Sequence, residues 1–168
     1  MLSNMGPIGV QILAAPFIIL HIDTIFLNHL YILFLVKKVM CAGTFDIIHP
    51  GHLYYLSEAK KYGDNLIVVV ARDETSKYFK GKKPVHNEKE RLEAVRMLKI
   101  VDKAVLGHQG NIFDIIEEIK PDVICLGYDQ KVQKQQVEEE LKKRGIKADV
   151  IRIGSYMQNV YKSSKMSK

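Results

Sequence analysis

From Lys37 onward, short apolar runs alternate with segments of helical periodicity, and this alternation is the feature that most constrains the fold. The run over 65–71 is apolar without alternation, as expected for a strand that is covered on both faces. Strands followed by helices with short connections predict a parallel sheet wound in the right-handed sense. The fold class is therefore α/β, a Rossmann-like, doubly wound parallel sheet of five strands. The predicted strands are 38–42, 65–71, 103–106, 122–126 and 148–153.

Helices are predicted between these strands from their caps and their periodicity. Pro50 suits the first turn of a helix that continues to residue 62, and Gly63 suits its end. Asn87 followed by Glu90 resembles a capping box at the start of the next helix. Further helices are predicted over 112–119, where isoleucines recur at helical spacing, and over about 133–143.

Residues 1–36 differ in composition from the rest of the chain. They contain 24 apolar residues, no Lys or Arg, and a single charge at Asp23. A transmembrane helix needs about 20 mostly apolar residues, but here Pro16 and Asp23 interrupt the run. We expect residues 1–36 to be an N-terminal extension, from a misassigned start codon or acting as a membrane anchor, with a folded element as the third alternative. Residues 37–168 are expected to form the functional domain.

The net charge of +6 and the pI near 9.2 suggest an anionic partner, which leaves nucleotide, nucleic acid and anionic membrane open. Cys41 and Cys125 lie in apolar runs without metal-ligand spacing, which excludes a disulfide scaffold and a zinc finger and fits a reducing cytoplasm. No basic stripe is interleaved with stacking aromatics, so a nucleic-acid-binding module is disfavoured.

The segment Gly43-Thr-Phe-Asp-Ile-Ile-His-Pro-Gly-His52 follows the first strand, at the edge where parallel sheets bind ligands. The start of a helix there offers free N–H groups and a partial positive charge to an anion. His49 and His52 are three residues apart, so both imidazoles can donate hydrogen bonds to phosphate oxygens. On these residues alone, a polar turn with helix-capping histidines stays open.

Gly43-Thr-Phe-Asp46 and His49-Pro-Gly-His52 together resemble the signature of the cytidylyltransferase-like nucleotidyltransferase superfamily, whose HxGH fold is of the predicted class. Within it, Ala71-Arg-Asp-Glu74 and Leu126-Gly-Tyr-Asp-Gln130 resemble the archaeal FAD synthases, which are FMN adenylyltransferases. The resemblance begins near Lys37 and implies a nucleotidyltransferase domain over 37–168. It implies transfer of AMP from ATP to FMN, giving FAD and pyrophosphate, with a divalent cation such as Mg²⁺ and a homodimer. Together with the composition, this predicts a cytoplasmic enzyme that does not bind nucleic acid.

The resemblance also assigns roles to individual residues. It makes His49 and His52 the catalytic residues, in contact with the triphosphate. The metal ligands stay undefined. The positions assigned to nucleotide binding, besides the two histidines, are Thr44, Phe45, Pro50, Gly51, Asp129 and Tyr156.

Several neighbouring residues have two interpretations. Asp46 is expected to cap the helix rather than bind a ligand. Arg91 either reaches a phosphate, as the resemblance implies, or is an exposed ion-pair partner. The Ser163-Ser164 pair matches a phosphate-binding element near the C-terminus only weakly. Two further segments are ligand contacts or ordinary loop residues: Arg72-Asp73 and the lysines Lys80, Lys82 and Lys83.

Two other functions remain as alternatives. One is a glycerol-3-phosphate-type cytidylyltransferase that uses CTP, because base choice depends on a few contacts at strand ends. The other is the basic nucleic-acid-binding module, which a strong salt dependence of affinity for RNA or DNA would support.

Overall fold

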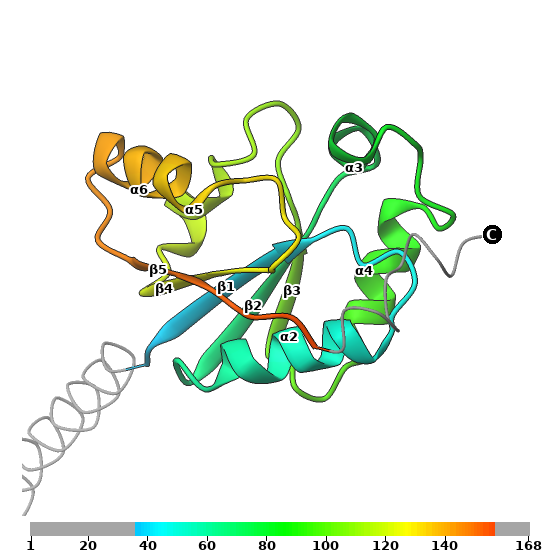
Figure 1. Cartoon of the computed structure of the whole chain (residues 1–168), viewed down its shortest axis with the longest axis horizontal. Coiled ribbons are helices and arrows are strands. Elements are labelled where there is room, and N and C mark those ends of the chain that lie inside the picture. Colours follow the sequence, from blue (N-terminus) through cyan, green and yellow to red (C-terminus); the bar gives the residue numbers. More distant parts are fainter. Residues whose placement is uncertain (1–35, 157–168) are drawn as a thin grey trace, which may run out of the picture. The chain divides into compact units, whose positions relative to one another are not determined.

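The computed structural model describes residues 36–156, and there the predicted fold class is confirmed (Figure 1). All strand pairings are parallel, and the strand order is β3-β2-β1-β4-β5. The strands are β1 (Lys38–Gly43), β2 (Asn65–Val70), β3 (Lys103–Leu106), β4 (Val123–Leu126) and β5 (Asp149–Arg152). The helices are α2 (Pro50–Lys60), α3 (Asp73–Lys80), α4 (Glu88–Arg96), α5 (Ile115–Ile119) and α6 (Lys134–Lys143).

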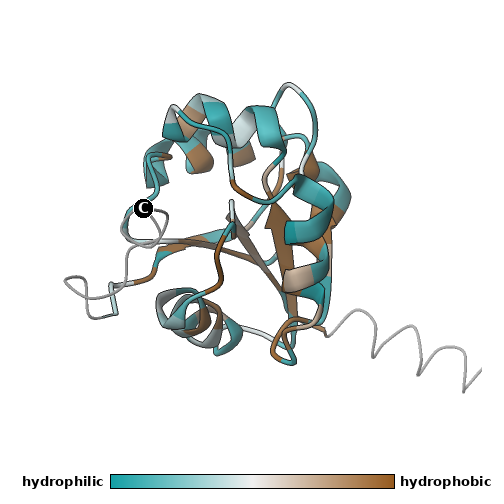
Figure 2. Cartoon of the chain, turned by 90° about the vertical axis from the view of Figure 1, so that its right-hand side faces the viewer, coloured by the Kyte–Doolittle hydropathy of each residue, from teal (hydrophilic) through white to brown (hydrophobic). Residues whose placement is uncertain are grey.

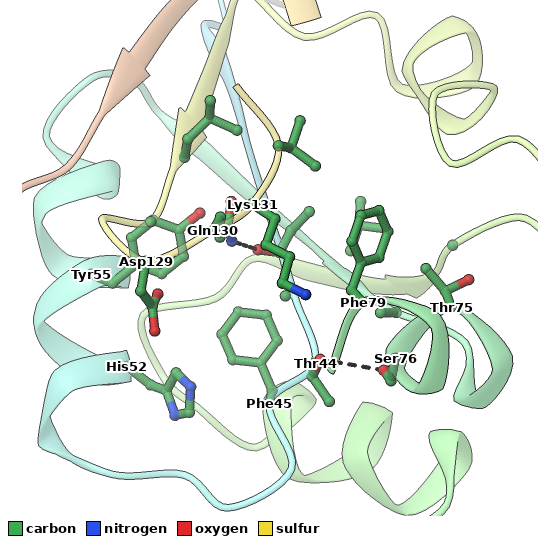
Figure 3. A pocket seen from close by; sticks show the side chains of 18 of the residues that line it. Thr44, Phe45, His52, Tyr55, Thr75, Ser76, Phe79, Asp129, Gln130 and Lys131 are labelled. Carbon is green, nitrogen blue, oxygen red and sulfur yellow. Dashed lines mark hydrogen bonds between the residues drawn. The ribbon is translucent and has the colours of Figure 1, made fainter. Parts of the chain in front are cut away.

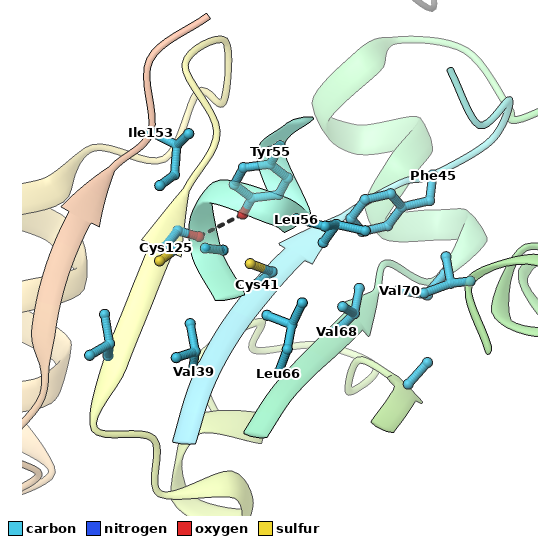
Figure 4. Close-up of a cluster of buried hydrophobic side chains, with 14 of the residues drawn as sticks. Val39, Cys41, Phe45, Tyr55, Leu56, Leu66, Val68, Val70, Cys125 and Ile153 are labelled. Carbon is cyan, nitrogen blue, oxygen red and sulfur yellow. Dashed lines mark hydrogen bonds between the residues drawn. The ribbon is translucent and has the colours of Figure 1, made fainter. Parts of the chain in front are cut away.

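The sheet separates two apolar clusters because successive strand residues point to opposite faces. On one face, Val39 and Cys41 of β1 pack with Leu56 of α2 and Val95 of α4 (Figure 4). On the other face, Met40 packs in the cluster that α5 and α6 cover. Figure 2 shows apolar strands enclosed by largely hydrophilic helices. Both cysteines are buried strand residues, as predicted.

Two helices differ from the sequence-based prediction. Helix α3 was not predicted, because Ser76 is its single buried residue and no apolar stripe marks it. Its signals are the acidic first turn and Gly81, which ends it with a φ of 73°. Helix α5 is shorter than the predicted 112–119, because the Asn111 side chain accepts a hydrogen bond from the Phe113 N–H in the turn before it.

The sequence suggests that Gly63 ends helix α2, but the structure shows that this position needs glycine because another segment passes close to it. The C-cap of α2 is Lys61, two residues earlier. A Cβ atom on Gly63 would lie 2.6 Å from the Lys37 carbonyl oxygen and 2.8 Å from the Val39 side chain. The glycine therefore lets the end of the α2 connection pass close to the beginning of β1.

We expect Gly63→Ala to lower the free energy of unfolding by about 1–3 kcal/mol, because the added methyl group overpacks against backbone. Urea denaturation followed by circular dichroism measures this change. Gly154→Ala is the matched control, since its Cβ meets no atom within 4 Å. Equal stabilities of the two variants would contradict the close-approach explanation.

The predictions for the N-terminal extension and for Ser163-Ser164 lie outside the described residues. No helix in the described part of the chain has the length and apolar character that crossing a bilayer requires.

Candidate active site

A cavity of about 530 Å³ opens at the carboxyl ends of the strands. It spans the ends of β1 and β4, which are neighbours in the sheet although β2 and β3 lie between them in sequence. In doubly wound sheets this switch point is where ligands bind, and the volume suits a small-molecule site. All predicted site residues except Pro50 line this cavity, and Figure 3 shows several of them.

His49 and His52 lie together at the start of α2, with their rings stacked at a centroid distance of 3.9 Å. His49 is the N-cap residue and is buried. Its Nδ1 accepts a hydrogen bond of 3.1 Å from the Gly51 N–H. An accepting Nδ1 places the proton of the neutral ring on Nε2, so this nitrogen is a donor.

Both imidazoles are held in the neutral form. The pKa of His52 is lowered to about 3. Burial is the main cause, and the neighbouring His49 and Lys80 contribute to the same shift. Burial also lowers the pKa of His49, and Asp129 opposes this while Lys80 adds to it. The His52 Nδ1 is buried and has no hydrogen-bond partner among residues 36–156. A buried polar atom of this kind is ready to bind a ligand atom.

The expectation of free N–H groups at the start of α2 is wrong. Pro50 has no N–H, and the Gly51 N–H is bound to the His49 ring. The N–H groups of His52 and Leu53 both bond to the His49 carbonyl oxygen. The helix dipole still favours an anion here, but the polar atoms on offer are those of the imidazoles.

Asp46 does not cap α2, so that prediction is also wrong. Its two carboxylate oxygens each accept a 2.9 Å hydrogen bond, one from the Val85 N–H and one from the His86 N–H. Burial alone would raise the pKa of Asp46, but these hydrogen bonds outweigh it and lower the pKa. Asp46 thus ties the loop after α3, which carries Lys82 and Lys83, to the loop after β1.

Thr44 and Phe45 form the turn between β1 and the histidines. Phe45 has a φ of 51°, which is uncommon for a residue with a side chain. Its ring is 2% exposed, and a Cβ atom on Gly43 would lie 2.8 Å from that ring. The ring also lies 5.2 Å from the His52 ring. Burial of the Phe45 ring therefore stabilises a strained backbone directly beside the histidines.

Arg91 neither reaches the cavity nor lies exposed, so both interpretations of it are wrong. Its side chain is fully buried. The guanidinium donates hydrogen bonds to the carbonyl oxygens of Thr44, Ala71 and His86, and it pairs with the Asp73 carboxylate at 2.7 Å. Arg91 joins the turns that follow β1 and β2.

Two other arginines act in the same way on the remaining loops. Arg72 donates to the Gly107 carbonyl oxygen after β3 at 2.7 Å and pairs with Glu88 at 2.8 Å. It also lines the cavity, so a contact with substrate stays a prediction. Arg152 donates to the carbonyl oxygens of Gly127 and Val132, both at 2.7 Å, in the loop that carries Asp129.

Basic residues gather around the cavity from two elements. Lys80 ends α3, and Lys82 and Lys83 follow it in the loop. Desolvation lowers the pKa of the Lys80 ammonium, while Asp129 and Asp46 oppose that change. Lys131, in the loop after β4, also lines the cavity, and Figure 3 shows its ammonium between Phe45 and Phe79.

Tyr156 also lies at the predicted place. Its ring stacks on that of Tyr54 from α2, with centroids 5.0 Å apart. Both tyrosines line the cavity.

The sequence does not point to several further lining residues. Thr75 and Phe79 are on the unpredicted α3, and Ser76 donates to the Thr44 hydroxyl at 3.3 Å. Gln130 donates from its side chain to the Ala42 carbonyl oxygen (Figure 3). The acidic first turn of α3 and the glycine after it were the available signals for this helix.

The lowered pKa of His52 predicts how stability depends on pH. The unfolded His52 binds a proton near pH 6.5 and the folded one near pH 3, so the unfolded state holds more protons between these values. The free energy of unfolding should therefore fall as pH drops below about 6.5, by up to about 1.4 kcal/mol per pH unit. Urea denaturation at pH values from 7.5 to 5 measures how the free energy of unfolding depends on pH, and this interval lies above the pH at which carboxylates titrate. In the His52→Asn variant this dependence on pH should be weaker, and an unchanged dependence would contradict the lowered pKa of His52.

The chain matches known proteins over the part that holds this site. Residues 40–167 match a family model described as cytidylyltransferase-like. A curated relative from Ferroglobus placidus, named FAD synthase, is 56% identical over 117 residues, which are 70% of this chain and 76% of the relative. A relative of the same name from Thermoplasma volcanium is 45% identical over 131 residues, which are 78% of this chain and 92% of the relative.

Two solved structures agree on the fold. The crystal structure of a lipopolysaccharide core biosynthesis protein from Thermoplasma volcanium superposes with a TM-score of 0.70 at 46% identity, covering 72% of this chain and 98% of that one. The pantoate-beta-alanine ligase from Francisella tularensis superposes with a TM-score of 0.53 at 14% identity, covering 74% of this chain and 61% of that one. The second likeness concerns the fold alone.

Proposed function

Because the chain belongs to the cytidylyltransferase-like family, among its archaeal FAD synthases, we propose that it transfers AMP from ATP to FMN, with FAD and pyrophosphate as products. The observation that carries this proposal is the pair of stacked, neutral histidines in a cavity bordered by lysines, within a chain about half identical to FAD synthases. Transfer of a phosphoryl or nucleotidyl group depends mainly on hydrogen-bond donors and cations that stabilise charge on the phosphates, and less on a nucleophile of the enzyme.

In this reaction an oxygen of the FMN phosphate attacks the α-phosphorus of ATP in line. A new P–O bond forms, the bond from the α-phosphorus to the bridging oxygen breaks, and pyrophosphate leaves. The FMN phosphate is largely ionised at pH 7, so no general base is required. We assign to His49 Nε2–H and to His52 the donation of hydrogen bonds to the triphosphate as charge develops on its oxygens.

The remaining assignments concern nucleotide binding. Thr44 and Phe45 would hold the nucleotide at the turn after β1, with Pro50 and Gly51 shaping the start of α2. Asp129, which lines the cavity from the loop past β4, would contact the nucleotide. Tyr156, stacked on Tyr54, would lie against the adenosine.

A divalent cation is part of the proposal. Within residues 36–156, no three side chains of the metal-binding types gather into a site. Mg²⁺ commonly takes one or two carboxylates together with substrate phosphates and water, and Asp129 supplies such a carboxylate while Asp46 is occupied by backbone N–H groups. The residues therefore fit a cation carried mainly by ATP. When bound, it would neutralise charge on the phosphates.

Removal of the cation provides a test of this part. We expect EDTA in excess over Mg²⁺ to abolish pyrophosphate release, and added Mg²⁺ to restore it, because four negative charges of ATP would otherwise repel the FMN phosphate. Circular dichroism of the protein should not change, since no cluster of metal-binding side chains lies among residues 36–156. Full activity in EDTA would contradict the proposal.

We further propose that the enzyme acts in the cytoplasm as a homodimer on small molecules and does not bind nucleic acid. Residues 1–36 would be an appendage that catalysis does not need, with 37–168 as the catalytic domain. Pyrophosphate release by residues 37–168 and by the full chain would then be equal within about twofold.

The deciding experiment compares pyrophosphate release with ATP plus FMN against CTP plus glycerol 3-phosphate, using the full chain. We expect turnover with ATP and FMN, with FAD identified by chromatography. Turnover with the cytidylyl pair alone would retain the reaction class and overturn the substrate assignment. Inactivity with both pairs would overturn the proposed enzyme.

A further inference from the structure

The cavity has a second part on the sheet face opposite the histidines, and its lining is apolar. We name this part the apolar arm. Four of its lining side chains belong to the cluster under α5 and α6, and Phe79 and Ile112 line the same cavity without belonging to either cluster, whereas Phe45 and Tyr55 belong to the cluster under α2. The apolar arm is lined by Met40, Val69, Phe79, Ile112, Ile116 and Val137.

The two parts of the cavity meet at the end of β1, and two lysines line the cavity near this junction. Lys80 extends from the end of α3 and interacts electrostatically with His49 and His52, and Lys131 extends from the loop after β4. Figure 3 shows the Lys131 ammonium between the rings of Phe45 and Phe79. An anion at this junction would contact lysines, and a group attached to it could extend into the apolar arm.

The chemistry of the two substrates differs in a way that matches these parts. FMN joins a flat, three-ring isoalloxazine with two methyl groups to a phosphate, so an apolar body carries an anionic end. Adenosine carries two ribose hydroxyls and a smaller, more polar base. The part of the cavity beside Asp129 and Gln130 has a carboxylate and an amide oxygen for such a ligand, whereas the side chains that line the apolar arm are apolar.

We propose that the apolar arm binds the isoalloxazine ring of FMN, with Phe79 against the ring and the FMN phosphate at the lysine-lined junction. Phe79 is half-buried and its ring faces the cavity across from Phe45 (Figure 3). This inference rests on the proposed function and adds the residues that select the acceptor. It also gives a role in substrate binding to α3, whose single buried residue is Ser76.

The test uses the full chain and separates the two substrates. Phe79→Ala should raise the KM for FMN at least about fivefold, the lower range for loss of an aromatic stacking partner. The KM for ATP should stay within twofold, and Phe79→Leu should recover part of the loss. Riboflavin, which has the ring without the phosphate, should inhibit competitively against FMN, and Phe79→Ala should raise its inhibition constant by a similar factor.

Tyr62→Ala is the matched control, because Tyr62 is an exposed aromatic outside the cavity lining. A rise in the KM for ATP instead of FMN would place the adenine in the apolar arm and overturn the inference, and so would no change in either constant. Riboflavin binding, followed by quenching of flavin fluorescence, separates this inference from the proposed function. A chain that binds riboflavin through Phe79 but forms no FAD would retain the flavin site and overturn the activity.

Discussion

Replacing His52 with Ala should lower kcat/KM for FAD formation by about 10²–10³-fold, the usual effect of removing one preorganised donor. His52 is neutral because burial lowers its pKa to about 3, and its Nδ1 has no partner among the described residues. Its loss should therefore reduce activity more than stability. Steady-state kinetics, with thermal unfolding measured in parallel, separate the two effects.

His49 requires a variant that preserves its structural role. His49→Ala removes both the donor and the N-cap acceptor of α2, which alone would cost about 1 kcal/mol. His49→Ser retains a capping oxygen but is too short to reach the phosphates. We expect His49→Ser to restore stability and to remain as inactive as His49→Ala. Recovery of activity in His49→Ser would show that His49 matters through the cap alone.

The second large effect concerns Arg91, whose replacement by Ala should lower the free energy of unfolding by about 3–5 kcal/mol. The change leaves the carbonyl oxygens of Thr44 and Ala71 without their donor, and it leaves Asp73 without its partner. It also opens space where the side chain is 0% exposed. Urea denaturation gives the difference directly.

Arg96→Ala is the control on the same helix. Within the described part of the chain Arg96 pairs with Glu93 alone, and both side chains are about half-exposed or more, so the loss should stay below about 0.5 kcal/mol. Arg91→Lys should recover only part of the stability, because an ammonium cannot reproduce the forked geometry. Equal effects of Arg91→Ala and Arg96→Ala would contradict the role of Arg91 in joining the turns after β1 and β2.

The placement of the site followed from sequence because it depends on local patterns. The apolar run of β1 ends at Gly43, and ligands bind where parallel strands end, so Thr44, Phe45 and His52 had to lie near the cavity. Asn87 was identified as a cap because its interactions stay within four residues, and the capping box is present.

The residues that hold the site together could not be inferred in the same way, because their partners are distant in sequence. Arg91 donates to Thr44, 47 residues away, and Asp46 accepts from His86, 40 residues away. In the sequence, Arg91 looks like a phosphate ligand or an exposed ion-pair partner, and Asp46 looks like a helix cap. Only the tertiary structure shows that both charged side chains already form hydrogen bonds with backbone groups.

The sequence by itself therefore determined the strands, most helices, the fold class and the histidine pair, since periodicity, capping and spacing are local properties of a chain. The tertiary structure alone decided the strand order and the arginines that fix the loops. It also brought α3 to the cavity and placed an apolar arm across β1 from the histidines. The physical reason is that these features arise from contacts between elements far apart in sequence, and no local pattern of residues records which elements will meet.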